Sequence, residues 1–234
     1  MPNIILIETS TSLCSTALIR DEKIVCVRES AEARSQAAMT APFVKEMLDE
    51  AGIGMSDCDA VCVSAGPGSY TGLRVGVSTA KGLCFASGIP LISVNTLELL
   101  LNQAISEDLV PADCRHVIPM IDARRMEVYA AVFSRDKEGN FTRTEEISPV
   151  VVDSDSFRKE REEGTVLFIG DGAGKCSDLL AGAGCIFIQT NPRAEAMLRP
   201  ALKAYKEKRF ESTAYFEPFY LKQFVATVSK RNLL

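Results

Sequence analysis

The chain has 234 residues, of which 47% are hydrophobic and 24% are charged, and its formal net charge is −5. This length fits one large domain or two lobes that bury a sizeable core. A net acidic molecule does not attract nucleic acid as a whole, so any RNA contact must be local. The apolar runs are too short to span a bilayer, and no leader-like segment opens the chain, so we expect a soluble, cytoplasmic protein.

The cysteines and the single histidine exclude several kinds of site. Most of the eight cysteines lie within apolar strand or helix patterns, and we expect them to be reduced. No Cys-x-x-Cys pair occurs, and His116 is the only histidine. The sequence therefore argues against a zinc site and against Ser–His or Cys–His catalysis.

The first half of the chain predicts strands followed by alternating helices and strands. A predicted helix covers 34–51, and because Pro42 lies inside it we expect a kink or a start near Thr40. Asn95 is a plausible N-cap for a later helix that ends near Ile105. The expected strands are Ile4–Glu8, Ser15–Arg20, Ile24–Glu29, Ala60–Ser64 and Leu91–Val94.

The second half repeats this theme after a polar break at 106–115, which predicts lobes at 1–106 and 115–234. A strand, the turn 122–125 and a second strand at 127–133 echo the hairpin at the start of the chain. Each hairpin places an acid, Glu8 or Asp122, at the end of an apolar strand. Further strands are expected at 150–152, 166–169 and 185–189, and helices at 155–162, 175–180 and 194–208. This order indicates the α/β class.

A glycine-rich turn, Gly66-Pro67-Gly68, joins a buried strand to a helix that begins near Leu73. The N-terminus of a helix carries unpaired N–H groups and can hold a phosphate. The same glycines also suit a plain strand-to-helix connection. Neither the dinucleotide fingerprint nor the P-loop spacing is present.

Small residues recur every four positions along that helix, at Gly72, Gly76, Ala80 and Cys84. Two internal glycines cost the helix about 1 kcal/mol each relative to alanine, so they suggest that something approaches closely. The stripe can face the other predicted helix, the sheet or another chain, and the residues alone leave this choice open.

Several motifs together carry a family resemblance. They are Ile-Glu-Thr-Ser at 7–10, Ala-Gly-Pro-Gly-Ser-Tyr-Thr-Gly-Leu-Arg-Val-Gly at 65–76, Ala-Lys-Gly-Leu at 80–83 and Asp-Ala-Arg-Arg at 122–125. Weaker support comes from Gly170–Ala173 and from Phe219–Lys222. The chain resembles the TsaB (YeaZ) family, the non-catalytic subunit of the bacterial tRNA threonylcarbamoyladenosine synthase. The resemblance implies duplicated ribonuclease H-like lobes of the actin, Hsp70 and sugar-kinase (ASKHA) superfamily.

The resemblance also implies a set of partners. A family member pairs with the catalytic paralogue TsaD through two helices, here 40–51 and 72–85. The ATPase TsaE docks on that heterodimer, and tRNA is met indirectly through the complex. For the chain alone, the sequence leaves both a monomer and a homodimer open, since an unpartnered apolar face tends to bind another copy. The partner-binding residues that this implies are Ala41, Val44, Met47, Leu48, Gly72, Leu73, Gly76, Val77, Ala80 and Cys84.

One segment departs from the related proteins. The catalytic subunits bind a metal through histidines before the position of Pro42, whereas residues 35–39 of this chain contain none. We therefore expect no metal, no cofactor and no metallopeptidase activity. Many family members have His-Ser-Glu where this chain has Gln36-Ala37-Ala38, which alters the hydrogen bonding available to a partner.

The alternative hypothesis is an ATP-dependent phosphotransferase of the same fold. Glu8 and Asp122 would organise a hydrated magnesium ion, and the turn 66–71 would face the phosphates. We favour the simpler interpretation that these acids are solvated turn carboxylates, since no phosphate-reading lysine accompanies them. The candidate nucleotide or phosphate residues are Glu8, Thr9, Ser10, Gly68, Ser69 and Asp122. A basic run at Lys203, Lys206, Lys208 and Arg209 reads as a solvated helix face or an RNA groove.

Overall fold

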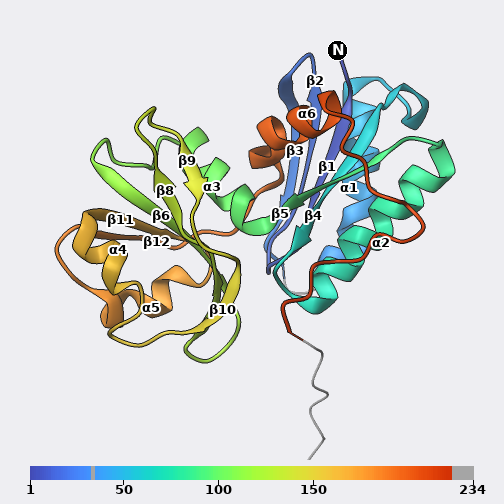
Figure 1. Cartoon of the computed structure of the whole chain (residues 1–234). Helices are drawn as coiled ribbons and strands as arrows, with labels where there is room; N and C mark the ends of the chain where they lie inside the picture. The colour runs from blue at the N-terminus through green and yellow to red at the C-terminus, as the bar shows by residue number, and fades with distance from the viewer. Residues whose placement is uncertain (33–34, 223–234) are drawn as a thin grey trace, which may run out of the picture.

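A computed structural model describes residues 1–32 and 35–222 of the chain and shows two β-sheets side by side (Figure 1). The first sheet has the strand order β3-β2-β1-β4-β5. Its first three strands are antiparallel, and β4 and β5 continue the sheet in parallel with β1. The strands are β1 (Ile4–Glu8), β2 (Cys14–Arg20), β3 (Lys23–Ser30), β4 (Ala60–Gly66) and β5 (Leu91–Asn95).

The second sheet repeats this arrangement in the order β10-β7-β6-β11-β12. Antiparallel strands again stand on one side of the central strand β6 and parallel strands on the other. The strands are β6 (Cys114–Asp122), β7 (Glu127–Ala130), β10 (Ser148–Val151), β11 (Thr165–Ile169) and β12 (Cys185–Ile188). The same order and sense in both sheets confirm the predicted fold, a pair of ribonuclease H-like lobes of the ASKHA type.

The strand expected at 127–133 is divided in two. β7 pairs with the end of β6, whereas β8 (Phe133–Arg135) pairs with its beginning and with β9 (Phe141–Arg143). Residues 131–132 lie between the two pairings. A continuous apolar run in the sequence does not reveal such a change of register.

One face of the first sheet is covered by α1 (Ser35–Ala51) and α2 (Tyr70–Ser87). Side chains of both helices, including Met47 and Val77, pack against the apolar face of the sheet. A start near Thr40 is wrong, since α1 already begins at Ser35; Arg34 lies outside the described residues. Pro42 is accommodated inside α1 on its exposed side, where water can reach the carbonyl that proline leaves unpaired.

The other face of the first sheet is covered by a C-terminal element. The short 3₁₀ helix η2 (Ala194–Met197) and α6 (Leu198–Lys206) place Met197, Ala201 and Ala204 against it. The predicted division assigned this element to the second lobe. The structure differs because the first sheet has a second apolar face that its own segment of chain does not cover.

The helix α3 (Thr96–Ser106) lies between the two sheets in Figure 1 and packs on both. Leu99 belongs to the first lobe's core, whereas Leu97, Leu100 and Leu101 belong to the second's. Asn95 caps the helix as expected, since its side chain accepts a hydrogen bond from the N–H of Leu97 at 2.9 Å.

The remaining helices are η1 (Met55–Asp57), α4 (Arg158–Glu163) and α5 (Ala173–Leu180). Of these, α5 packs on the outer face of the second sheet through Ala173, Cys176 and Leu180. Residues 211–222, which we call the strap, run along α2 toward the space between the lobes (Figure 1). No helix in the described ranges combines the length and the apolarity that a bilayer crossing requires.

Candidate functional site

The glycine-rich turn at the start of α2 is closed by the β1–β2 turn. The N–H of Ser69 donates to the carbonyl of Ser10 at 2.6 Å, and Ser69 Oγ accepts from the N–H of Gly72 at 3.3 Å. A Cβ on Gly68 would lie well inside 3.0 Å of the Ser10 carbonyl. These contacts within the protein weigh against the phosphate role expected of Gly68 and Ser69, which stays a prediction.

The stripe of small residues faces the sheet rather than another chain. Thr9 lies directly under it, and its hydroxyl donates to the carbonyl of Gly72 at 2.7 Å. A Cβ added to Gly72 would collide with the carbonyl oxygen of Thr9, and one added to Gly76 with its Oγ1. The close approach that the glycines suggested is real, but the neighbour is the end of β1.

Burial changes the list of partner-binding residues accordingly. Of the ten predicted, only Ala41 is exposed, and nine are buried in the first lobe: Val44, Met47, Leu48, Gly72, Leu73, Gly76, Val77, Ala80 and Cys84. These nine pack the two helices onto the sheet, although Val44 and Leu48 also line a groove at the surface. A bulky residue at Gly76 would disturb the fold rather than probe an interface.

The opposite sides of the same two helices form a different surface, which we call the outer helical face. It is defined by Ala38, Ala41 and Lys45 of α1 and by Ser78, Gly82 and Phe85 of α2, all exposed. Phe85 is 86% exposed. A groove of about 250 Å³ lies beside it, and its lining residues are Ala41, Val44, Lys45, Leu48, Asp49, Ile53, Gly54, Met55 and Leu83.

Sequence reasoning overlooked Phe85 although a signal existed. Phe85 is out of phase with Leu73, Val77, Ala80 and Cys84, so the helical pattern already places it on the other side of α2. A single exposed aromatic ring is ordinary on a protein surface, but Phe85 lies beside exposed Ala and Gly residues of the same helices, and a contiguous apolar patch of this kind is typical of an interface.

Glu8 is fully buried at the end of β1 and is not a solvated carboxylate. Its Oε1 accepts a hydrogen bond from the N–H of Ser10 at 2.5 Å, while Oε2 is buried with no hydrogen-bond partner among the described residues. Burial raises the pKa of Glu8 to about 7, and polar interactions with Ser10 and Ser64, which lower the pKa, oppose part of this rise. Near neutral pH, Glu8 is therefore only partly charged, which weakens it as a magnesium anchor.

Asp122 meets two residues that sequence reasoning missed, Asp171 and Lys175. The Asp122 N–H donates to Asp171 Oδ1 at 2.9 Å, and Lys175 forms an ion pair with the Asp122 carboxylate. Burial raises the pKa of Asp171 to about 6, and the charge of Asp122 adds to the rise. A lysine does accompany the acid, but Asp122 already neutralises it. These partners lie about fifty residues away in the sequence, beyond any local pattern.

Asp171 also links the two hairpin acids, since its charge contributes to the raised pKa of Glu8. Asp171 therefore lies near enough to Glu8 for their charges to interact. Nevertheless, within residues 1–32 and 35–222 no three His, Cys, Asp or Glu side chains converge as metal ligands.

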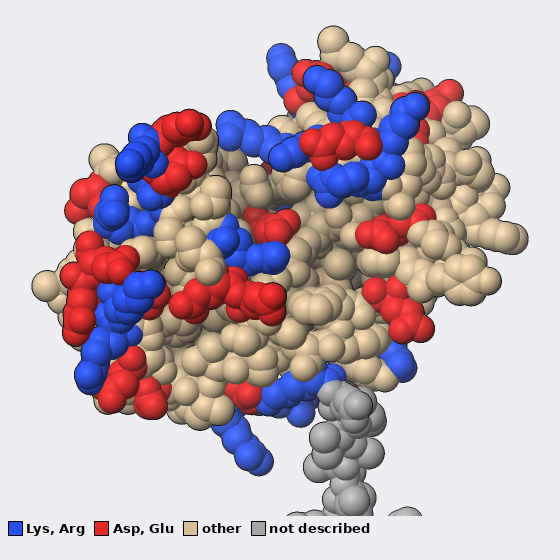
Figure 2. Space-filling model, in the orientation of Figure 1, with Lys and Arg blue, Asp and Glu red and all other residues tan. Residues whose placement is uncertain are grey.

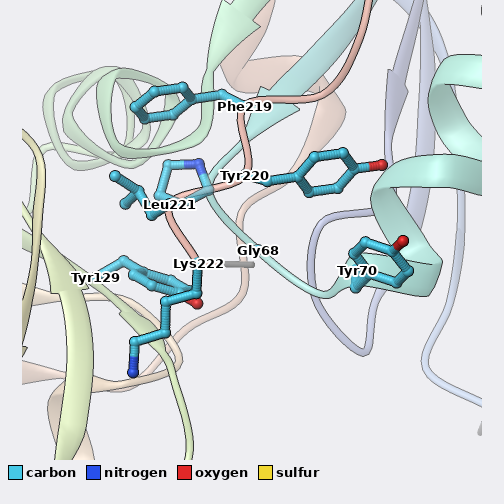
Figure 3. Close-up of a pocket in the computed structure, with 8 residues that line it drawn as sticks. Gly68, Tyr70, Tyr129, Phe219, Tyr220, Leu221 and Lys222 are labelled. Atoms are coloured by element: carbon cyan, nitrogen blue, oxygen red, sulfur yellow. The ribbon is translucent and has the colours of Figure 1, made fainter. Parts of the chain in front are cut away.

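The strap fastens α2 and closes a small pocket between the lobes (Figure 3). The N–H of Phe219 donates to the carbonyl of Ala65 at 2.7 Å, and Lys222 pairs with Glu127 of the second lobe. The pocket holds about 50 Å³, room for one or two waters but not for a nucleotide. It is lined by Pro67, Gly68, Tyr70, Tyr129, Phe219, Tyr220, Leu221 and Lys222.

The loop between β6 and β7 has an unusual backbone. Arg124 and Arg125 adopt φ values of +72° and +51°, in the left-handed region that usually belongs to glycine. Each such residue costs roughly 1–3 kcal/mol, so the chain accepts strain at this loop. Both side chains are exposed, and neither forms an ion pair within the described part of the chain.

Comparison with known proteins gives a consistent result. Residues 28–155 match the family model described as TsaD, tRNA N6-adenosine threonylcarbamoyltransferase. The tRNA threonylcarbamoyladenosine biosynthesis protein TsaB of Escherichia coli is 30% identical over 95% of this chain and 96% of its own length. The Haemophilus influenzae protein of the same name is 31% identical over 92% of both chains. The solved structure of YeaZ from Pseudomonas aeruginosa superposes with a TM-score of 0.81 at 26% identity, covering 94% of this chain and all of that one.

Proposed function

The chain belongs to the TsaB (YeaZ) family, and from this premise we propose that it acts in tRNA threonylcarbamoyladenosine biosynthesis as an accessory subunit without chemistry of its own. Its partner is a TsaD-type paralogue, which carries out the transfer. The observation that carries this proposal is the outer helical face, with its small apolar residues, its groove and the exposed ring of Phe85.

The outer helical face has the composition of a surface that packs helix on helix. Ala38, Ala41 and Gly82 have little or no side chain, so the axes of a partner's helices can come close. At Gly82 no neighbouring atom of the described residues lies within 4 Å of the Cβ position, so that space is open to a partner. Phe85 offers an aromatic anchor of the kind that dominates binding energy.

A TsaD-type paralogue is a suitable partner for this face, because the TsaD family model matches the segment that contains both helices of the face. The match spans 28–155, which includes both α1 and α2, so a paralogue of that family carries counterparts of the same two helices. Two related chains can then pair face to face about an approximate twofold axis. When no paralogue is present, the same reasoning predicts a homodimer through this face.

The proposal that this chain carries out no reaction of its own is supported by its polar groups, which are already engaged with one another. The start of α2 is occupied by the β1–β2 turn, and Lys175 is paired with Asp122. The buried ring of His116 contacts Ser134 Oγ at 2.9 Å and Glu163 Oε2 at 3.1 Å, so it has a structural role in β6. Docking of TsaE, a cytoplasmic location and the lack of a metal or cofactor stay predictions.

The test is to mix the chain with a TsaD paralogue and measure the molar mass of the product by light scattering. We expect a one-to-one heterodimer, and we expect Phe85→Glu to weaken it at least tenfold. Val151→Glu is the matched control, because Val151 is 71% exposed on β10 of the other lobe. If the wild-type chain forms no heterodimer, or if Val151→Glu weakens it as much as Phe85→Glu, the proposal is wrong.

A further inference from the structure

We propose that the surface between the two lobes binds single-stranded RNA. The surface, which we call the arginine–tyrosine surface, is defined by Arg124, Arg125 and Lys222 together with Tyr70, Tyr220 and Arg74. The inference rests on the proposed function in one respect, since a pathway that modifies tRNA brings RNA to the complex. Nothing in the relatives' names assigns a nucleic-acid contact to this chain.

The two arginines are the cations that are free to bind phosphate. In the surrounding cluster, Lys175 is paired with Asp122 and Lys222 with Glu127. The guanidinium groups of Arg124 and Arg125 have no acidic partner within the described residues and stand exposed on a strained loop. A chain whose net charge is −5 therefore presents a local excess of positive charge here.

Carboxylates lie close to these cations. Asp122 and Glu127 pair with Lys175 and Lys222, and Asp171 accepts a hydrogen bond from the N–H of Asp122 at 2.9 Å. Glu217 of the strap lies near enough to Arg74 for their charges to interact. The N–H of Arg124 donates to Asp122 Oδ1 at 2.8 Å, which holds the loop in place. Figure 2 shows acidic and basic side chains interspersed over most of the visible face, with basic side chains gathered along its lower edge between the lobes.

Aromatic rings accompany these cations, which points to bases rather than to phosphate alone. The rings of Tyr70 and Tyr220 are 5.0 Å apart, and the guanidinium of Arg74 lies 4.0 Å from the centre of the Tyr70 ring. Arg74 also donates to the Tyr220 hydroxyl at 3.2 Å. Figure 3 shows Tyr129 on the other side of the strap, beside Lys222. Bases of single-stranded RNA stack on such rings and on guanidinium planes.

The small volume of the pocket between the lobes limits which ligands this surface can bind. The pocket of about 50 Å³ cannot admit a base, so bases must lie across its rim while phosphates reach the arginine loop. A free mononucleotide would gain little from such an open site. An extended strand contacts both lobes at once, because Arg74 lies on α2 beside Tyr220 of the strap, whereas Arg124 and Arg125 lie on the β6–β7 hairpin of the second lobe.

The test uses the heterodimer with the TsaD paralogue and a fluorescent RNA oligonucleotide that has the sequence of an unmodified anticodon loop. We expect the R124A/R125A variant to bind it at least tenfold more weakly at moderate salt. The slope of log affinity against log salt should fall by about 1.4, as two lost phosphate contacts on a single strand predict. Tyr220→Ala should weaken binding about tenfold with little change in that slope, because stacking releases no counterions.

The K206A/K208A variant is the matched control. It removes the same charge from α6 and its C-terminal end, where neither lysine is paired within the described residues. We expect it to bind RNA as the wild type does. The proposal is overturned if the heterodimer does not bind the RNA, if R124A/R125A leaves affinity and slope unchanged, or if both double variants weaken binding equally. Failure to form the heterodimer is a separate result, seen by light scattering before RNA is added, and it counts against the proposed function.

Discussion

Replacing Gly72 with alanine distinguishes internal packing from docking on the small-residue stripe. The new Cβ would lie far inside 3.0 Å of the carbonyl oxygen of Thr9. That oxygen belongs to the backbone beside β1, a central strand paired on both sides, so it cannot turn away as a side chain would. Gly82 lies on the same helix with nothing within 4 Å of its Cβ position, which makes Gly82→Ala the matched control.

The two substitutions are expected to change stability in opposite directions. Alanine in place of glycine inside a helix gains about 1 kcal/mol, and at Gly82 nothing opposes this gain. At Gly72 the backbone of α2 or of Thr9 must shift, and overpacking of a filled core costs about 1–3 kcal/mol or more. The shift also strains the bond from Thr9 Oγ1 to the Gly72 carbonyl. We expect Gly72→Ala to lose about 2 kcal/mol relative to Gly82→Ala.

Urea unfolding followed by circular dichroism measures this difference in the free energy of unfolding. In thermal unfolding, about 2 kcal/mol corresponds to a difference of roughly 4–8 °C in melting temperature for a chain of this size. The packing of Gly72 against Thr9 is refuted if Gly72→Ala stabilises the chain as Gly82→Ala does. That result would mean that the stripe is not packed against β1.

Two further substitutions test the buried acid and the C-terminal element. Burial raises the pKa of Glu8 from 4.5 to about 7, so the folded chain holds this proton more tightly than the unfolded chain, and stability is lost as the pH rises through this range. The stability of Glu8→Gln relative to the wild type should therefore grow by ~2–3 kcal/mol between pH 5 and pH 8 in urea titrations; a constant difference would contradict the burial of a titrating carboxyl. Met197→Ala should cost about 2–5 kcal/mol, because Met197 is fully buried against the first sheet; a loss below about 1 kcal/mol in the same assay would show that η2 and α6 are loosely attached.

Patterns confined to one segment predicted much of the fold. The first hairpin, the order of strands and helices, and the cap at Asn95 follow from periodicity and turn chemistry, and the structure confirms them. The duplicated architecture was implied by the family resemblance, and the two hairpins that end in Glu8 and Asp122 agreed with it. These features depend on neighbours in the sequence, which is the information that a pattern contains.

Features that depend on distant residues were not predictable in the same way. The stripe at Gly72 and Gly76 showed that something approaches closely, but only the structure shows that it is Thr9. The pairing of Lys175 with Asp122 and the contact of Tyr220 with Tyr70 join segments that are far apart in the sequence. The two helices expected to bind a partner do lie in the first lobe, and of the ten residues chosen on them nine are buried and Ala41 is exposed. Whether the outer helical face binds the paralogue stays a prediction.

Reconstituted transfer of the threonylcarbamoyl group to tRNA tests the role of this chain most directly. The assay supplies the activated threonylcarbamoyl donor and TsaE, and it compares the TsaD paralogue alone, this chain alone and the two together. We expect modified adenosine only when both are present, with the yield reduced by Phe85→Glu and unchanged by Val151→Glu. Modification by this chain alone, or full activity of the paralogue without it, would contradict its role as an accessory subunit.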